Sequence, residues 1–201
     1  VEKVLSHPEL ELRGFHSHIG SQIFGTDSFQ LAADRLISLL AKYRNVYGKE
    51  LPELDLGGGY GIAYLPGDET LEPGEVMPAL RSAVTASCEK HKLNIPVISI
   101  EPGRAIVGPT TFTLYEVGTT KDVVLEDGAI RRYISVDGGM SDNIRPSLYD
   151  AQYHAVIAQR ISTAKSISSR VVGKHCETGD IVIRDISLPA DIAPGDLIAI
   201  P

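Results

Sequence analysis

Long apolar runs are missing from this sequence of 201 residues. No stretch approaches the roughly eighteen consecutive apolar residues that a membrane-spanning helix needs, so we expect no membrane partner. The first sixteen residues have charged side chains scattered through them and no apolar core. That composition does not fit a secretory signal peptide.

Cysteine and positive charge are also scarce. The two cysteines, Cys88 and Cys176, lie far apart, which does not fit the disulfide framework of a small secreted protein. We therefore expect a reducing compartment, the cytoplasm. The formal net charge is -7, with 26 acidic and 19 basic residues and no basic stripe, which argues against nucleic acid as a partner. A locally positive pocket for a small anionic ligand remains compatible with that balance.

The first half of the sequence alternates between strand and helix signals. Strands are predicted over residues 12–16, 51–56 and 95–100, and helices over residues 27–48 and 75–92. Such alternation is typical of parallel strands joined by helical crossovers. Three such units are too few to close an eight-stranded barrel, but they can form a consecutive arc of one.

Each predicted helix has an apolar stripe at helical spacing. The first stripe consists of Leu31, Leu36, Leu39, Leu40 and Tyr43, and the second of Val76, Leu80 and Val84. Cys88 lies in the second helix and is expected to be a small buried side chain.

The second half is rich in Val, Ile, Thr and Tyr, with turn residues between short apolar segments. These strand-like segments cover residues 111–117, 131–136, 155–160, 169–172, 180–186 and 196–200. The sequence thus predicts an α/β domain over residues 1–108 and an all-β domain over residues 109–201. It begins without Met and ends within a predicted strand, so we expect a truncated or cleaved chain.

The polar residues of the first half cluster where its three strands end. The endings are HSHIGSQ from His16, GGGYG from Gly57 and EPGR from Glu101. Active sites of βα barrels are built from such strand ends. The glycines suit a phosphate, because backbone N–H groups can approach an anion there, although a tight strand-to-helix turn explains them equally well.

Other side chains at these strand ends have open interpretations. His18 could stack on a planar ligand or transfer a proton, but a lone histidine is more often structural. Ser21 could donate to a phosphate or cap a helix. Glu101 and Arg104 could form a weak surface ion pair, or bind a cofactor nitrogen and an acidic group inside a pocket.

The second half has two polar segments, SVDGGMSDNIRPSLY from Ser135 and HCETGD from His175. Arg145 and Tyr149, four residues apart, could both donate to a carboxylate, although a solvated loop explains them too. Cys176 lies beside Glu177, and a neighbouring carboxylate raises a thiol pKa. That favours a neutral proton donor over a thiolate nucleophile at Cys176.

In order, the segments HSHIGSQ, LDLGGGYGI, EPGR, VDGGMSDNIRPSLY and CETGD resemble diaminopimelate decarboxylases, across essentially the whole sequence. The resemblance implies the last strands of a pyridoxal-phosphate-binding (β/α)8 barrel, followed by a partial β-domain. It implies decarboxylation of meso-2,6-diaminopimelate to L-lysine and CO2, and a homodimer with shared active sites. Ornithine and arginine decarboxylases belong to the same wider group. Another diamino-acid decarboxylase or a non-catalytic homologue therefore stays an alternative.

The resemblance also implies a role for each matching residue. His18 would stack on the pyridine ring, and Glu101 would pair with the pyridine nitrogen. Cys176 would reprotonate the substrate carbon, and Glu177 would contact the distal amino group in the neighbouring subunit's site. The phosphate would be bound by Ser21, Gly58, Gly59, Gly103 and Arg104, and the distal carboxylate of the amino-acid substrate by Arg104, Arg145 and Tyr149.

One essential residue of the resembled family has no counterpart here. Its Schiff-base lysine lies on an early barrel strand, before Val1, and a late tyrosine that contacts the phosphate would follow Pro201. None of the eight lysines follows a predicted barrel strand in a matching context. We therefore expect the sequence to correspond to a C-terminal half that needs its missing N-terminal half, and to be inactive alone.

Overall fold

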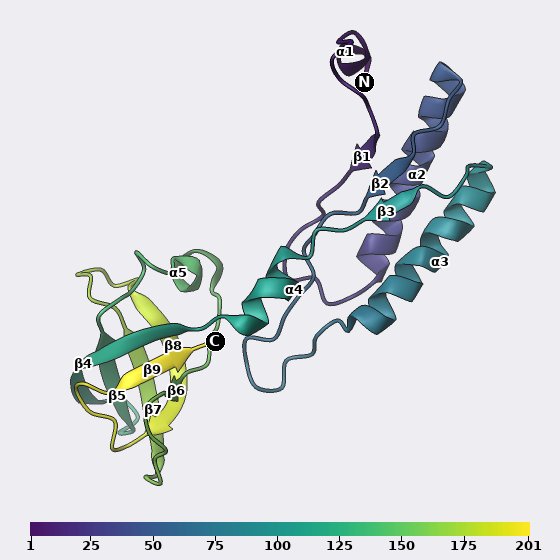
Figure 1. The fold of residues 1–201 in the computed structure, drawn as a ribbon. Helices are drawn as coiled ribbons and strands as arrows, with labels where there is room; N and C mark the ends of the chain where they lie inside the picture. The colour runs from purple at the N-terminus through teal and green to yellow at the C-terminus, as the bar shows by residue number, and fades with distance from the viewer. The chain divides into compact units, whose positions relative to one another are not determined.

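The computed structural model describes residues 1–201, and the chain divides into two units (Figure 1). Unit 1 consists of Val1–Ile62 and Glu69–Val107, and unit 2 of Ala63–Asp68 and Gly108–Pro201. The loop of residues 63–68 thus packs with unit 2, and the domain ranges 1–108 and 109–201 stay a prediction. None of the helices combines the length and apolar character that crossing a membrane would require.

Unit 1 contains a sheet of three short parallel strands in the order β1-β2-β3. The strands are β1 (Gly14–His16), β2 (Glu53–Asp55) and β3 (Val97–Ser99). Each lies inside a segment where the sequence predicts a strand, and the predicted parallel arrangement is confirmed. The strands end in register, with His16 beside Asp55 and Asp55 beside Ser99, so the loops that follow them begin at one edge of the sheet.

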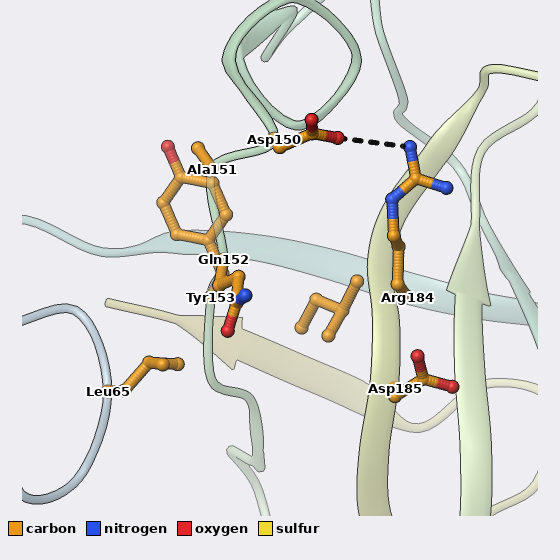
Figure 2. A pocket seen from close by; sticks show the side chains of 8 residues that line it. Leu65, Asp150, Ala151, Gln152, Tyr153, Arg184 and Asp185 are labelled. Carbon is orange, nitrogen blue, oxygen red and sulfur yellow. Dashed lines mark ion pairs between the residues drawn. The ribbon is translucent and has the colours of Figure 1, made fainter.

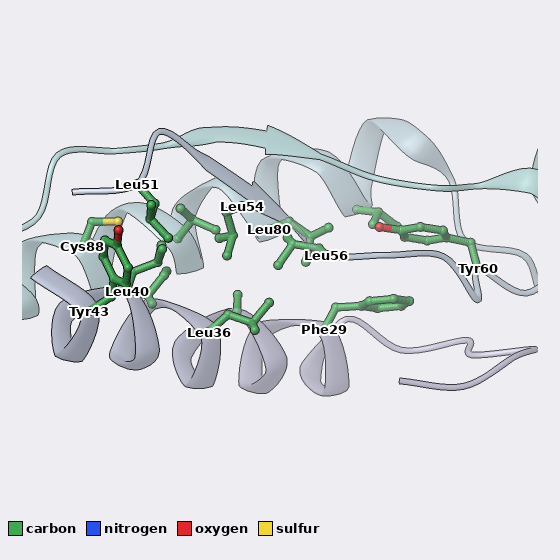
Figure 3. Packing of buried hydrophobic residues seen from close by; sticks show 14 residues of the cluster. Phe29, Leu36, Leu40, Tyr43, Leu51, Leu54, Leu56, Tyr60, Leu80 and Cys88 are labelled. Carbon is green, nitrogen blue, oxygen red and sulfur yellow. The ribbon is translucent and has the colours of Figure 1, made fainter. Parts of the chain in front are cut away.

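Two long helices, α2 (Asp27–Tyr47) and α3 (Pro73–His91), pack with one face of this sheet. Helix α2 ends where the sequence predicts, at Gly48, whose φ of 70° is favourable for glycine. Figure 3 shows Phe29, Leu36 and Leu40 of α2 directed towards the strand residues. The shared core comprises Phe29, Ala33, Leu36, Ile37, Leu40, Tyr43, Leu51, Leu54, Leu56, Tyr60, Val76, Leu80, Val84 and Cys88.

The apolar stripe predicted for α2 is partly wrong. Leu31 and Leu39 are exposed, whereas Phe29 and Ile37 are fully buried. At about 100° per residue, Leu31 lies about 200° around the helix from Phe29. The buried stripe therefore begins at Phe29. The stripe predicted for α3 is confirmed, and Cys88 is buried as expected.

The remaining helices of unit 1 are short: α1 (Glu2–Leu5) and α4 (Gly103–Val107). The 3-10 helix Gly108–Thr110 belongs to unit 2.

Unit 2 contains a six-stranded sheet in the order β6-β9-β4-β5-β7-β8. Its strands are β4 (Thr113–Val124), β5 (Ile130–Val136), β6 (Val156–Ile157), β7 (Ser166–Val172), β8 (Ile181–Pro189) and β9 (Leu197–Ile200). All neighbours are antiparallel except β5 and β7, which are parallel. Each strand overlaps a predicted one, and the only α-helix of unit 2 is the five-residue α5 (Arg145–Tyr149). The all-β character is thus confirmed.

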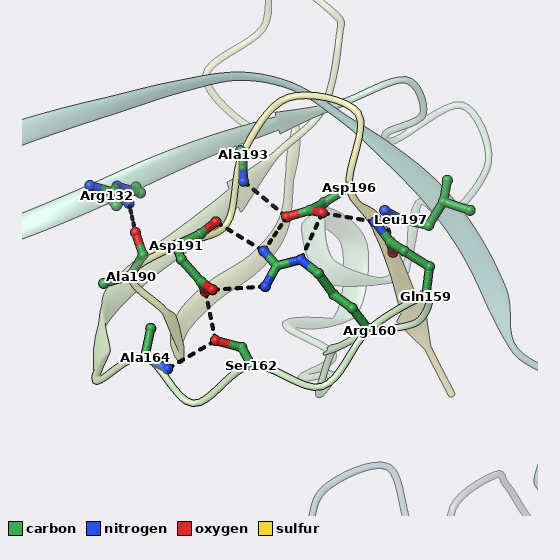
Figure 4. Close-up of polar contacts among 10 residues, drawn as sticks. All are labelled: Arg132, Gln159, Arg160, Ser162, Ala164, Ala190, Asp191, Ala193, Asp196 and Leu197. Atoms are coloured by element: carbon green, nitrogen blue, oxygen red, sulfur yellow. Dashed lines mark hydrogen bonds and ion pairs between the residues drawn. The ribbon is translucent and has the colours of Figure 1, made fainter.

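An ion network centred on Arg160 joins two loops of unit 2 (Figure 4). Arg160 Nη2 lies 2.7 Å from Asp196 Oδ2, and Arg160 Nη1 lies 2.8 Å from Asp191 Oδ2. The Asp196 carboxylate also accepts hydrogen bonds from Gln159 Nε2 at 2.8 Å and from the Ala193 amide at 3.0 Å. This largely buried carboxylate therefore ties the segment after β6 to the turn before β9.

We expect Asp196→Asn to lower the free energy of unfolding by about 2–3 kcal/mol, because Arg160 loses the ion pair with the less exposed of its two carboxylate partners. Urea denaturation at neutral pH measures this. Asp185→Asn is the matched control: that carboxylate pairs with Arg131 at 3.0 Å but is 64% exposed, so its loss should cost less than about 1 kcal/mol. Equal costs for the two variants would contradict the account.

The stability lost in Asp196→Asn should depend on pH. Hydrogen bonds from Arg160 hold the pKa of Asp196 below its ordinary value. Because the folded-state pKa lies below the unfolded-state value of about 3.9, this stabilisation is present above about pH 4 and is lost as the pH falls through the folded-state pKa. The stability difference between wild type and Asp196→Asn should therefore shrink at about pH 3.

Candidate functional site

The loops that follow β1, β2 and β3 are joined by main-chain hydrogen bonds. The Ile23 amide donates to the Gly59 carbonyl at 2.9 Å, which connects the first and second loops. The Glu101 amide donates to the Gly57 carbonyl at 2.8 Å, which connects the second and third. The three predicted endings therefore form one continuous edge at the carboxyl ends of the strands, where ligands of parallel βα structures bind.

The glycines of the second loop have a packing role of their own. A Cβ atom at Gly57 would overlap the Ser17 carbonyl oxygen, and one at Gly58 would overlap the Glu101 carbonyl oxygen. Gly59, with φ of 103°, approaches the Gly20 carbonyl equally closely. Glycine is therefore required for the three loops to meet, whether or not a phosphate binds.

The loop nevertheless leaves donors available. The Gly57 amide donates to Asp55 Oδ1 at 2.8 Å, but the amides of Gly58 and Gly59 have no protein acceptor. Gly103 differs, because its amide donates to the Glu101 carbonyl at 2.9 Å. Of the glycines predicted to bind phosphate, Gly58 and Gly59 thus have amides that could donate to a phosphate. The Gly103 amide already donates to a protein carbonyl.

Arg104 and Ser21, both predicted phosphate ligands, lie together. Arg104 Nη2 donates to Ser21 Oγ at 3.0 Å, although the residues are 83 positions apart. His18, between β1 and Ser21, is exposed at the same edge. A guanidinium, a hydroxyl and open backbone amides are groups that bind a phosphate, and an exposed imidazole can stack on a planar ring.

One interpretation of the sequence is an ion pair between Glu101 and Arg104. In the structure, Glu101 does not form this ion pair. Its Oε2 atom lies 3.2 Å from His16 Nε2. His16, Asp55 and Glu101 place one ligand atom each within 4.8 Å of one another, so these side chains could hold a metal ion or a protonated nitrogen. His16 and Asp55 also line a groove of about 270 Å³ on the sheet face opposite α2 and α3.

In unit 2, a buried carboxylate connects the two predicted polar segments. Asp180, 4% exposed, accepts hydrogen bonds from the Met140 amide at 2.6 Å and the His175 amide at 2.7 Å. His175 Nε2 is also 2.8 Å from Ser141 Oγ. The loop carrying Cys176 is therefore held against the loop that leads into α5.

Cys176 and Glu177 lie exposed at the turn of that loop. The Asp180 amide donates to the Glu177 carbonyl at 3.0 Å, which closes the turn. Both side chains are thus free to meet another molecule.

Arg145 and Tyr149 lie together at the ends of α5. The Arg145 guanidinium carbon lies 5.6 Å from the centre of the Tyr149 ring, and Arg145 Nε donates to Tyr153 Oη at 3.1 Å. Arg145 Nη1 and Nη2 have no protein acceptor, so they could bind a carboxylate in a bidentate manner.

Unit 2 has a pocket of about 360 Å³ beside Tyr153 (Figure 2). Asp150 and Arg184 form an ion pair of 3.5 Å across its wall. None of the site residues predicted from the sequence lines it.

Of the predicted site residues, His18, Ser21, Gly58, Gly59, Glu101, Gly103 and Arg104 lie in unit 1, and Arg145, Tyr149, Cys176 and Glu177 lie in unit 2. The sequence does not reveal the contacts of His16, Asp55, Tyr153 and Asp180. His16 and Asp55 stand inside recognised segments, and strand register alone could have pointed to them. Tyr153 carries no signal in the sequence.

Two family models match the chain. The model described as "Pyridoxal-dependent decarboxylase, pyridoxal binding domain" matches residues 1–108, and the one described as "Pyridoxal-dependent decarboxylase, C-terminal sheet domain" matches residues 67–201. The chain belongs to the pyridoxal-dependent decarboxylase family. The cofactor that this membership implies is pyridoxal phosphate, as the sequence predicts.

Within this family, the chain is similar to diaminopimelate decarboxylases. It is 51% identical to that of Corynebacterium efficiens over 191 residues, which are 95% of this chain and 42% of the relative. It is 50% identical to that of Mycobacterium bovis over 204 residues, covering 100% of this chain and 46% of the relative. The chain thus spans about half the length of these relatives.

Solved structures that are similar to this chain also include diaminopimelate decarboxylases. The diaminopimelate decarboxylase of Helicobacter pylori, complexed with L-lysine, matches 99% of this chain with a TM-score of 0.80 and 30% identity. That of M. jannaschii, also with L-lysine, matches 99% with a TM-score of 0.85 and 25% identity. The chain covers 45% and 43% of those two chains.

Proposed function

We propose that the chain forms part of an enzyme that decarboxylates meso-2,6-diaminopimelate to L-lysine and CO2 with pyridoxal phosphate. The observation that carries the choice of substrate is the Arg145 guanidinium, whose two terminal nitrogens have no protein acceptor. Diaminopimelate has a carboxylate at its far end, and a fixed guanidinium matches it. Ornithine ends in an ammonium, which would favour acidic side chains instead.

For the cofactor, we assign the edge formed by the loops of unit 1. Ser21, Arg104 and the amides of Gly58 and Gly59 would bind the phosphate, with Gly103 shaping the turn. His18 would stack on the ring. Glu101 would hold a proton at the pyridine nitrogen, and when bound, the cofactor would withdraw electrons from the substrate carbon that loses CO2.

For the substrate, we assign the exposed residues of unit 2. Arg145 and Tyr149 would bind the distal carboxylate, and the Tyr149 ring would cover the guanidinium face. Cys176 would return a proton to the substrate carbon, and Glu177 would accept a hydrogen bond from the distal ammonium. We further propose a cytoplasmic homodimer in which Cys176 and Glu177 of one subunit enter the site of the other, an arrangement that their exposure permits.

The proposed fold of the complete enzyme is a (β/α)8 barrel, of which β1 to β3 are consecutive strands, with a β-domain. None of the loops after β1, β2 and β3 contains a lysine. The Schiff-base lysine is therefore expected in the part of the relatives' length that this chain does not cover.

Arg145→Met in a full-length protein that carries this chain tests the substrate assignment. We expect the KM for meso-diaminopimelate to rise roughly 10–100-fold, because a charge-assisted hydrogen-bonded pair is lost. The matched control is Arg170→Met: Arg170 also lies over a tyrosine, Tyr133, at 5.7 Å, but pairs with Asp185 instead. Steady-state kinetics with an unchanged KM for Arg145→Met would reject the assignment.

A further inference from the structure

Arg145 is the residue of unit 2 whose orientation matters most to the proposed substrate site. Its backbone is anchored at the start of α5, where its amide donates to Asn143 Oδ1 at 3.2 Å. Its side chain still has several rotatable bonds, so an anchored backbone does not fix the direction of the guanidinium. Another contact must do so if the carboxylate is to meet a preformed receptor.

We propose that Tyr153 is the positioning residue that fixes the Arg145 guanidinium and thereby sets the affinity for the distal carboxylate; this rests on the proposed function. Arg145 Nε donates to Tyr153 Oη at 3.1 Å. Tyr153 is 7% exposed and belongs to the core of unit 2, and its ring meets the Tyr64 ring edge-on, with centres 5.2 Å apart. Its hydroxyl is therefore an acceptor at a fixed point.

The Tyr153 contact selects one edge of the guanidinium. A carboxylate can bind in a bidentate manner either at the Nε and Nη edge or at the edge formed by Nη1 and Nη2. Tyr153 already accepts from Nε, so the edge formed by Nη1 and Nη2 is left for a ligand. The substrate carboxylate consequently approaches Arg145 end-on, along the direction in which the side chain extends.

Tyr149 cannot provide the same constraint. Its ring lies 5.6 Å from the guanidinium carbon, so it contacts the face of the group and leaves rotation within the plane open. Tyr149 is also 66% exposed, whereas Tyr153 is held in the core. The two tyrosines thus have separate roles: Tyr149 covers the guanidinium and Tyr153 orients it.

The test is Tyr153→Phe in the full-length protein that carries this chain. Phenylalanine keeps the ring and its packing against Tyr64 and removes only the acceptor. We expect the KM for meso-diaminopimelate to rise roughly 3–10-fold with kcat changed less than about twofold, since one hydrogen bond to a charged group is lost. The inhibition constant of cadaverine, which has the same carbon chain with two amines but no carboxylate, should stay unchanged.

Tyr133→Phe is the matched control, because Tyr133 also lies beneath an arginine, Arg170, away from α5. In an Arg145→Met background, Tyr153→Phe should change the KM no further. An unchanged KM in the single variant, or an equal rise in the cadaverine inhibition constant, would overturn the role of Tyr153. Absence of turnover of meso-diaminopimelate by the unsubstituted protein would instead refute the proposed function.

A readout that needs neither turnover nor a variant is the Arg145 Nε–H resonance in nuclear magnetic resonance spectra of arginine-labelled protein. With Tyr153 Oη as acceptor, this proton should exchange with water at least roughly tenfold more slowly than in an unpaired arginine. Exchange as fast as in an unpaired arginine would contradict the proposal.

Discussion

Glu101→Gln in a full-length protein that carries this chain is expected to lower kcat for meso-diaminopimelate by roughly 10²–10³-fold. In the proposed role, the Glu101 carboxylate would stabilise a proton on the cofactor's ring nitrogen, and a neutral amide of the same shape would not. The KM should change much less, because Gln still fills the same space beside His16. Steady-state kinetics of the purified variant, with bound pyridoxal phosphate quantified separately, measure both effects.

Glu53→Gln is the matched control. Glu53 lies on β2 two residues before Asp55, pairs with Arg13 at 2.9 Å and lines the same groove as His16. Its replacement removes a carboxylate from the same region without touching Glu101, so kcat should stay within about threefold. Equal losses for Glu53→Gln and Glu101→Gln would show that the effect reflects the charge of the groove rather than a proton held at Glu101.

Cys176→Ala is expected to have the second large effect on kcat. The kcat for meso-diaminopimelate should fall by roughly 10²–10⁴-fold, which is the range for loss of a positioned proton donor. Asp180 holds the Cys176 loop through the Met140 and His175 amides, and this support remains when the thiol is removed. The KM should therefore stay within a few-fold of the wild-type value. A kcat within threefold of wild type would exclude Cys176 as the proton donor.

Cys88→Ala is the control for general effects of cysteine loss. Cys88 is 1% exposed in the core of unit 1, so this variant should lose some stability and keep its kcat. Burial, together with the Glu50 charge, raises the pKa of the Cys88 thiol, so Cys88 should resist alkylation while the exposed Cys176 reacts. Iodoacetamide treatment followed by peptide mass mapping should show activity falling as Cys176 is modified.

Periodicity and turn residues predicted most of the fold because they report local physics. The helix of residues 27–47 begins and ends within a residue of where Asp27 and Gly48 indicate, and Val76, Leu80 and Val84 are buried as their spacing requires. The predicted burial of Leu31 and Leu39 was wrong because leucine is equally apolar on either face of a helix. Only the packing of the strands decides which face is buried.

The candidate site shows the same division between local and long-range information. The segments around His18, Gly58 and Glu101 were recognisable because their residue types are unusual at strand ends. The contacts between segments were not: His16 with Glu101, and Arg104 with Ser21, join residues more than eighty positions apart. Such pairs depend on strand order and register, which a single sequence does not specify.

The glycines of the second loop illustrate a sequence signal with two causes. The sequence left a phosphate site and a tight turn equally open. Gly57 and Gly58 are needed because neighbouring carbonyl oxygens lie where a Cβ atom would be. The open amides of Gly58 and Gly59 suit a phosphate as well, so close packing and anion binding are compatible at this loop.

CO2 release from meso-diaminopimelate and from L-ornithine, measured for a full-length protein that carries this chain with pyridoxal phosphate present, tests the proposed substrate most directly. We expect a kcat/KM for meso-diaminopimelate at least about 10²-fold above that for L-ornithine, since only meso-diaminopimelate has a far-end carboxylate for Arg145. An equal or greater kcat/KM for L-ornithine would contradict the proposed substrate.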